Sequence, residues 1–458
     1  MFCRPDLPVA AMNDWYDAEQ RVEKARRLFE QRQWALCLEE LRAALSLQPY
    51  NSAYLFNIGL TLDELGEFDQ AIDAYRQSLE IKADDIDALN HLGVDLSRVG
   101  RHDEALTTFA AIEHIDAQYE PSYCNRIIIY TELGRHEQAE EMFYTARLYK
   151  DDCPHCYYNI GLSLMQRGLF DKAIYCWQKA LDLDEHRPQV HRRMAQAYWG
   201  KRELEKARQH YVQEMRSQPG DTQTLLELGK LLLEMGRHEE AGEKFRRAIE
   251  QAPEQPGGYY CHGRWLIEAG HDADAVAAFV RVLQLDPTFP GAHLQLGRIY
   301  LQHHDPDAAR RHLRSEHLLR GDDPRILLEL SDLLLDAGEG PMAIAALKRL
   351  TELSPGAANA FAHLAVAHFL SGDYAPGIAA SRRALDLEPA DLTAMHNLAV
   401  ACERLQQYDA ALQWVRTALL LEPANTSFQR MEWRLRFLKL RWRAGSFLGR
   451  IFARRPSI

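Results

Sequence analysis

The chain has 458 residues, of which 47% are hydrophobic and 26% charged, and its formal net charge at pH 7 is −12. This acidic balance argues against general nucleic-acid binding, because contacts to phosphates need lysine and arginine across the surface. Eight cysteines in a chain of this length favour a reducing compartment over a disulfide framework.

The first segment, residues 1–17, does not have the pattern of an export signal. It carries an acid at Asp6 and lacks the apolar run of a signal peptide, and Met12 is an alternative start. No run of 18 apolar residues occurs elsewhere, so no membrane-spanning helix is predicted. We therefore expect a short N-terminal extension and a cytoplasmic protein.

From residue 18 to 425 a pattern of 34 residues repeats twelve times without insertion. One column, read every 34 positions, contains ten alanines and no large residue. Its members are Cys37, Ala71, Ala105, Ala139, Ala173, Ala207, Ala241, Ala275, Ala309, Ala343, Gly377 and Ala411. This period and this column are typical of stacked antiparallel helix pairs, so we predict an all-α solenoid formed by one uninterrupted twelve-unit array.

Three further columns support the same register. A second small column lies in the first helix of each pair, with Ile127 its only large member. It reads Ala25, Gly59, Gly93, Ile127, Gly161, Ala195, Gly229, Gly263, Gly297, Ser331, Ala365 and Ala399. We expect it to receive the large residue found four positions after the alanine, at Tyr75, Phe109, Phe143, Trp177, Tyr211, Phe245 and Phe279. Glycine recurs where each pair reverses direction, as at Gly66, and five units open on proline, at Pro154, Pro188, Pro256, Pro290 and Pro324.

These columns resemble the tetratricopeptide repeat family, for example in NSAYLFNIGLTLDELGEFDQAIDAYRQSLEI at 51–81. The resemblance covers roughly nine-tenths of the chain. It implies a right-handed superhelix in which the first helices line a concave groove that binds partner proteins. Sugar transferases of the O-GlcNAc-transferase type also have such arrays, but a large catalytic domain follows theirs, whereas only 33 residues follow this one. The resemblance therefore implies a non-catalytic scaffold or adaptor.

The resemblance also places positions 2, 5, 6, 9 and 12 of each unit on the groove wall. Position 6 holds Asn57, Asn125 and Asn159. In family members that bind extended chains, such amides bond the ligand backbone, since an amide both donates and accepts. Other residue types interrupt the series, for example His91 and Arg193, so a continuous clamp is not expected. The alternative is that these are solvated helix residues.

Position 9 is basic in three consecutive repeats, at Lys230, Arg264 and Arg298. An earlier repeat adds two more cations, and aromatic residues flank the same wall. These are Arg192, Arg193, Tyr158, Trp199 and Tyr260. Clustered like charges are unfavourable unless an anionic partner offsets them. We therefore hypothesise an extended, partly acidic peptide bound along repeats 5–9; the alternative is a solvated face balanced by nearby glutamates.

The tetrapeptide Cys153-Pro154-His155-Cys156 is the strongest candidate for chemistry. It matches the active-site sequence of a family of bacterial thiol oxidases, and at a helix start the dipole and His155 would lower a thiol pKa. That activity needs a thioredoxin-type sheet, and no strand pattern occurs here. The pair is also half of a zinc site, which Cys124 and Cys176 could complete, although their spacing does not require it. We expect ordinary packing, with no metal or cofactor, and keep thiol-redox activity as an alternative.

The C-terminal segment, residues 426–458, is basic, with a net charge of +8. Apolar residues lie at helical spacing at Phe428, Met431, Leu435, Leu438 and Trp442. We expect a capping helix, because the last repeat otherwise exposes an apolar face. Residues 444–458 combine apolar residues with arginine. An alternative is therefore a peripheral membrane assembly or secretion factor, held on an anionic membrane surface by this segment.

Overall fold

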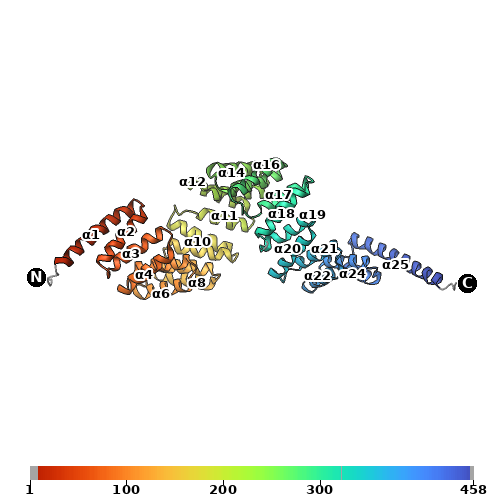
Figure 1. Cartoon of the computed structure of the whole chain (residues 1–458), viewed down its shortest axis with the longest axis horizontal. Helices are drawn as coiled ribbons and strands as arrows, with labels where there is room; N and C mark the ends of the chain where they lie inside the picture. Colours follow the sequence, from red (N-terminus) through yellow and green to blue (C-terminus); the bar gives the residue numbers. More distant parts are fainter. Residues whose placement is uncertain (1–8, 321, 454–458) are drawn as a thin grey trace. The chain divides into compact units, whose positions relative to one another are not determined.

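The computed structural model describes the backbone of residues 9–320 and 322–453, and the side chains of residues 15–320 and 322–443. Over these residues the chain forms 25 helices and no strand (Figure 1). In chain order they are α1 (Val9–Glu30), α2 (Trp34–Leu47), α3 (Ser52–Glu64), α4 (Phe68–Ile81), α5 (Ile86–Arg98), α6 (His102–Ile115), α7 (Glu120–Glu132), α8 (His136–Tyr149), α9 (Pro154–Gln166), α10 (Phe170–Leu183), α11 (Val190–Gly200), α12 (Leu204–Ser217), α13 (Thr222–Glu234), α14 (His238–Gln251), α15 (Pro256–Glu268), α16 (Asp272–Leu285), α17 (Ala292–Gln302), α18 (Pro306–Arg320), α19 (Pro324–Asp336), α20 (Gly340–Leu353), α21 (Ala358–Leu370), α22 (Tyr374–Leu387), α23 (Leu392–Arg404), α24 (Tyr408–Leu421) and α25 (Thr426–Ala453).

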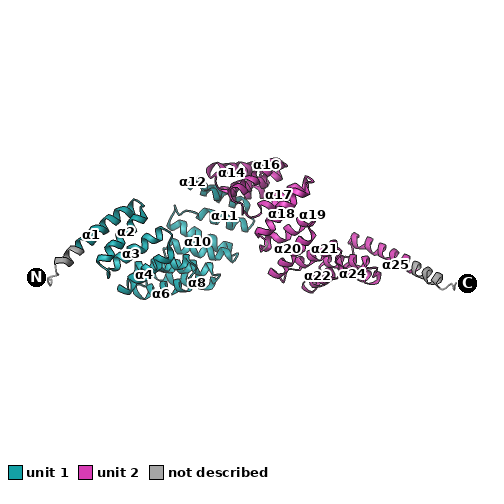
Figure 2. Cartoon of the chain, in the orientation of Figure 1, with its two compact units in different colours: residues 1–224 teal, residues 225–458 magenta. Residues whose placement is uncertain are grey.

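These helices form two compact units, residues 1–224 and 225–458 (Figure 2). Within each unit, a first helix packs antiparallel against a second helix, and the pair then packs against the next pair along the chain. Neighbouring first helices also touch, as α5 with α7 and α19 with α21 do. The predicted all-α stack of helix pairs is confirmed.

The packing reason for the small columns is visible at Gly59 and Tyr75. A Cβ added to Gly59 would lie 2.5 Å from Cε1 of the Tyr75 ring, and one added to Gly93 would lie 2.6 Å from Cζ of Phe109. The alanine column is buried in every repeat, from Cys37 to Ala411. The helices of a pair therefore approach each other too closely for larger side chains, as the repeat pattern predicts.

The turn inside each helix pair has one conformation, whether or not glycine is present. Gly66 has a φ of 79°, in the left-handed region that favours glycine. Four repeats place another residue at the same turn position, with φ between 57° and 63°. These residues are Arg32, Arg202, His304 and Gln406. The fold therefore imposes this turn on side chains that disfavour it.

Proline opens the first helix in three of the five units where the sequence places it. The helices α9, α15 and α19 begin at Pro154, Pro256 and Pro324. The prediction is wrong for Pro188 and Pro290, because α11 and α17 begin two residues later. In both repeats a left-handed residue, Gln189 or Gly291, precedes the helix.

A buried glutamate from the second helix explains these two shortened helices. Glu214 accepts hydrogen bonds from the backbone N–H groups of Gln189 and Arg192, at 2.9 and 3.1 Å. Glu316 does the same for Gly291 and Leu294, at 3.0 and 3.2 Å. The carboxylate thus satisfies helix N-terminal donors that an ordinary cap residue would otherwise satisfy.

The helix α25 covers the end of the last repeat, which confirms the predicted cap. Phe428, Met431 and Leu435 are buried against residues of α23 and α24. Leu438 is half-buried, and Trp442 is 49% exposed. The side chains of residues 444–458 lie outside the described residues, so their predicted membrane contact stays a prediction. Among the described residues, none of the helices has the length and apolar character needed to cross a membrane.

Candidate functional site

The predicted groove residues are divided between the two units. Asn57, Asn125, Tyr158, Asn159, Arg192, Arg193 and Trp199 belong to the first unit, and Lys230, Tyr260, Arg264 and Arg298 to the second. The hypothesis of one strip along repeats 5–9 therefore spans both units.

In the second unit, Lys230, Arg264 and Arg298 occupy the same position on the consecutive first helices α13, α15 and α17. Burial raises the pKa of the Cys261 thiol, and the charges of Lys230 and Arg264 oppose that rise. Burial also raises the pKa of Tyr260, against the charges of Arg264 and Arg298. Arg264 therefore acts on both side chains, whereas Lys230 acts only on Cys261 and Arg298 only on Tyr260.

These three cations differ in their partners. Lys230 and Arg264 are exposed, and neither has an ion-pair partner among the described residues. Arg298 forms an ion pair with Glu329 of the next first helix, α19. For Arg298, a nearby glutamate therefore balances the charge, as the alternative interpretation of the basic column states.

Tyr260 is packed into the wall and does not stand out from it. The ring is half-buried, with its centroid 5.6 Å from that of Phe279 and 5.1 Å from that of Phe289. Its hydroxyl lies close to Gly291, where an added Cβ would be 2.9 Å away. It can therefore offer a ring edge to a ligand, but it is not a projecting anchor.

The two cations of the first unit are largely engaged within their own repeat. The Arg192 side chain is only 12% exposed, and its Nη1 lies 3.6 Å from the Asp221 carboxylate. Nη1 of Arg193 donates a 3.1 Å hydrogen bond to Oε1 of Gln196. Trp199 is half-buried, with its ring edge-on to Tyr211 at 6.5 Å. These residues stabilise the repeat and offer little free charge to a ligand.

The position-6 asparagines connect successive repeats. Nδ2 of Asn159 donates to the carbonyl of Cys124 at 3.4 Å, and Nδ2 of Asn125 donates to Oδ1 of Asn90 at 3.3 Å. Asn159 is only 8% exposed. The amide groups that the family resemblance assigns to a ligand backbone are thus already used between helices.

Asn57 and Tyr158 have different surroundings. Asn57 is half-buried and lines a cavity of about 340 Å³ formed by α1, α2 and α3. The Tyr158 ring is covered by the Arg187 guanidinium, whose Cζ lies 4.8 Å from the ring centroid. Both residues belong to the first unit.

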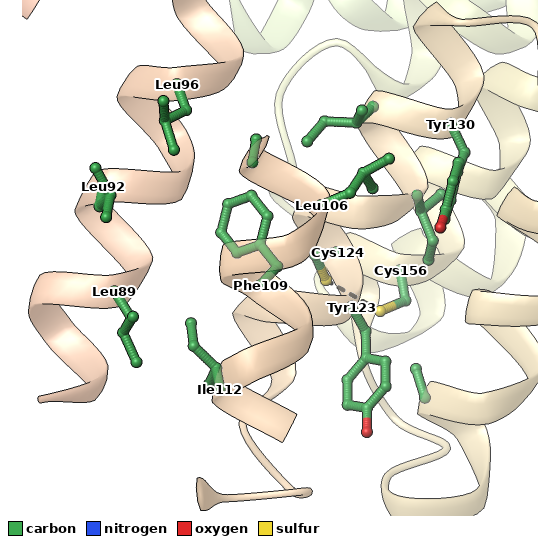
Figure 3. Packing of buried hydrophobic residues seen from close by; sticks show 14 of the residues in the cluster. Leu89, Leu92, Leu96, Leu106, Phe109, Ile112, Tyr123, Cys124, Tyr130 and Cys156 are labelled. Carbon is green, nitrogen blue, oxygen red and sulfur yellow. Dashed lines mark hydrogen bonds between the residues drawn. The ribbon is translucent and has the colours of Figure 1, made fainter. Parts of the chain in front are cut away.

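The structure brings a third cysteine to the Cys153/Cys156 pair. Sγ of Cys124 on α7 lies 3.6 Å from Sγ of Cys153 and 3.0 Å from Sγ of Cys156 (Figure 3). Oε1 of Glu120, also on α7, lies 2.8 Å from Sγ of Cys153. Cys176 lies elsewhere, in a pocket with Phe143 and Tyr157, and is not part of this cluster.

This cluster does not have the exposure of a reactive thiol pair. Hydrogen bonds from the Cys124 and Cys156 thiols hold the pKa of Cys153 well below its ordinary value, as the redox alternative requires. Yet Cys153 and Cys156 are only 2% and 1% exposed. A thiol that exchanges with a substrate must be reached by it, so burial disfavours the redox alternative.

The fold defines a class: helical-repeat proteins built from helix pairs that pack one after another along the chain. Tetratricopeptide repeat models match most of the chain, at residues 22–86, 154–187, 192–256, 266–315, 328–380 and 371–427. The chain therefore belongs to the tetratricopeptide repeat family. Its described residues consist of these repeats and their cap, an architecture typical of non-catalytic, protein-binding scaffolds.

Solved structures with the same repeats are similar over long stretches. The structure titled APC/C hetero-tetramer Cut9-Hcn1 is 14% identical, covers 93% of this chain and 98% of its own, and has a TM-score of 0.41. Yeast Tom70 is 14% identical, with coverages of 96% and 99% and a TM-score of 0.41. A tetratricopeptide repeat protein of Parabacteroides merdae is 16% identical, with coverages of 55% and 99% and a TM-score of 0.47. No curated protein matches the chain in sequence.

Proposed function

We propose that this protein is an interaction scaffold whose second unit binds an extended, acidic peptide along α13, α15 and α17. The observation that carries the proposal is the pair Lys230 and Arg264. Both are exposed, both lie at the same position of consecutive first helices, and neither has an ion-pair partner among the described residues. Arg298 continues the column on α17.

Charge explains why the ligand would be acidic. Adjacent cations repel each other, and carboxylates laid along the column would offset that repulsion. Each exposed ion pair contributes about 0.2–1 kcal/mol, so the affinity would be moderate. Dissolved salt screens such exposed pairs over a Debye length of about 8 Å at physiological ionic strength. This length shortens as salt is added, so binding would weaken.

The test measures binding of a fluorescent glutamate-rich peptide by anisotropy. We expect Lys230→Glu/Arg264→Glu to weaken binding by at least about tenfold relative to the wild type. The control, Arg247→Glu/Lys348→Glu, makes the same charge change at exposed residues of the second helices α14 and α20. It should stay within about twofold of the wild type. An equal loss in both variants would show that net charge, and not this column, governs binding.

A second candidate function, peripheral attachment to a membrane, is favoured by the surface of α25. Trp433, Phe437 and Leu440 are 72%, 66% and 68% exposed, and their spacing places them on one face of the helix. Exposed arginines at Arg430 and Arg441 lie nearby in sequence. Exposed aromatic residues beside cations are typical of helices that lie on anionic membranes.

Vesicle co-sedimentation tests this second function. Wild-type protein should pellet with vesicles that contain phosphatidylserine, and the variant Trp433→Ser/Phe437→Ser/Leu440→Ser should stay in the supernatant. Removing residues 444–458 alone measures what the end of the segment adds. Equal pelleting of the wild type and the triple serine variant would exclude attachment through this face.

A further inference from the structure

We propose that Cys124, Cys153 and Cys156 bind one zinc ion, with Glu120 as the fourth ligand. The three sulfur atoms all lie within 4.8 Å of one another, and all three side chains are buried. They come from two adjacent repeats: Cys124 from α7, and Cys153 and Cys156 from the start of α9. The site is independent of the peptide-binding proposal, because it lies in the first unit.

The distances between the sulfur atoms are close to those of a metal centre. Zinc binds thiolates at about 2.3 Å in a tetrahedron, which sets ligand sulfurs about 3.7 Å apart. The Cys124–Cys153 separation is already 3.6 Å, and Cys156 at 3.0 Å from Cys124 would move outward by a fraction of an ångström. In Figure 3 the Cys124 and Cys156 sulfurs point toward each other between α7 and α9.

The local sequence suits this chemistry as well. Two cysteines separated by two residues at a helix start provide ligand spacing common in structural zinc sites. Cys153 is the N-cap of α9, and its Sγ accepts a 3.0 Å hydrogen bond from the backbone N–H of Cys156. Helix N-terminal N–H groups stabilise negative charge, so this position favours the thiolate that a metal requires.

Glu120 approaches the cluster from the side of Cys153 and is not within 4.8 Å of all three sulfurs, so its carboxylate would move toward the other two on binding the ion. Its Oε1 lies 2.8 Å from Sγ of Cys153, and its Oε2 is bonded to Nζ of Lys150 at 2.8 Å. Lys150 would offset part of the negative charge of three thiolates and a carboxylate around a divalent ion. His155 also lies within 4.8 Å of Cys153 and Glu120, but it is exposed, so it serves as the control.

The donor set selects the kind of metal. Thiolates favour soft or borderline ions such as zinc, and a carboxylate oxygen is an accepted zinc ligand. Iron–sulfur clusters generally take four cysteines, and this cluster offers three. A bound ion would tie α7 to α9 and so stabilise the junction of the fourth and fifth repeats.

The first experiment measures metal content by mass spectrometry on full-length protein loaded with zinc and then dialysed. The wild type, Cys176→Ser and His155→Ala should each retain about one zinc per chain, the stoichiometry of a closed structural site. Cys124→Ser and Cys156→Ser should retain none, and Glu120→Ala should bind zinc about tenfold more weakly. Zinc retained by Cys124→Ser, or undiminished affinity in Glu120→Ala, would overturn the assignment of ligands.

The second experiment needs no variant and so does not depend on how the cysteine substitutions fold. Metal-free wild-type protein is titrated with Co²⁺ under reducing conditions. We expect the thiolate-to-cobalt charge-transfer band and the strong visible absorption of a tetrahedral site, both removed by stoichiometric zinc. Absence of these bands overturns the proposal. So does a Cys124–Cys156 disulfide in protein isolated and kept under reducing conditions.

Discussion

The indole ring of Trp177 fills the space in front of Gly161. A Cβ added to Gly161 would lie 2.7 Å from Cε2 of the ring, and the indole Nε1 donates a 3.1 Å hydrogen bond to the Tyr158 carbonyl. The ring is thus fixed by a bond as well as by packing. Gly229 and Phe245 in the second unit share the close packing but not the hydrogen bond, since a Cβ added to Gly229 would lie 2.4 Å from Cε1 of the phenylalanine ring.

Gly161→Ala should therefore destabilise the protein, although alanine is the better helix former. Overpacking against a fixed ring costs about 1–3 kcal/mol, measured as the free energy of unfolding in urea. Gly220→Ala is the control, because nothing lies within 4 Å of a Cβ at that position. It should be neutral or slightly stabilising. Equal effects of the two substitutions would contradict the packing explanation of the small column.

His304→Gly should stabilise the protein. His304 has a φ of 57°, which glycine adopts without the steric strain of a side chain. The expected gain is about 0.5–1 kcal/mol in the free energy of unfolding. The reciprocal change, Gly270→Ala at the same turn position with a φ of 76°, should lower the melting temperature. A destabilised His304→Gly would mean that the histidine makes a compensating contact.

Two half-buried histidine pairs should make the protein less stable in mild acid. Nδ1 of His210 lies 3.1 Å from Nδ1 of His191, and Nδ1 of His312 lies 2.9 Å from that of His293. Burial and then the partner ring lower the pKa of His210 and of His312 to about 4. The unfolded state therefore binds more protons, and stability is lost as the pH falls from about 6.5 to about 4.

We test the role of the histidine pairs by measuring the free energy of unfolding in urea from pH 7.5 to 5. The wild type is compared with His210→Gln/His312→Gln. The double variant should lose less stability on acidification than the wild type does. The comparison is necessary because Asp95 acts in the opposite sense: burial, with Asp63 nearby, raises its pKa to about 6. His238→Gln, which changes an exposed histidine, is the control variant. Identical slopes for the double variant and the wild type would exclude the pairs as the cause.

Leu435→Ala should weaken the packing of α25 against the last repeat. Leu435 is fully buried in the cap, so truncation should cost about 2–5 kcal/mol in the free energy of unfolding, as in other cores. Leu440→Ala on the same helix removes a side chain that is 68% exposed and should be close to neutral. If Leu435→Ala were as mild as Leu440→Ala, α25 would not act as a cap.

The sequence predicts the features that repeat, because each reflects one contact made many times. Gly59 with Tyr75 and the turn at Gly66 follow from single columns. The shortened helix after Pro188 could not be predicted this way, because its cause is a carboxylate on another helix, Glu214. The same holds for Asn159, whose partner is the Cys124 carbonyl in the preceding repeat.

For the candidate site, the position of the cations was predictable and their pairing was not. Lys230 and Arg264 share a column with Arg298, yet only the geometry between helices shows that Arg298 is paired with Glu329. Cys124 was recognisable as a possible partner of the Cys153 pair, but its approach depends on how α7 packs against α9. The column pattern therefore does not predict the side-chain contacts between repeats.

A charge swap at Lys230 and Arg264 tests whether these two residues bind the acidic peptide. The affinities of a glutamate-rich and a lysine-rich peptide of equal length are measured for the wild type and for Lys230→Glu/Arg264→Glu. We expect the wild type to bind the acidic peptide more tightly, and the variant to lose affinity for the acidic peptide and gain affinity for the basic one. If the variant keeps the wild-type preference, the column on α13 and α15 is not the binding surface.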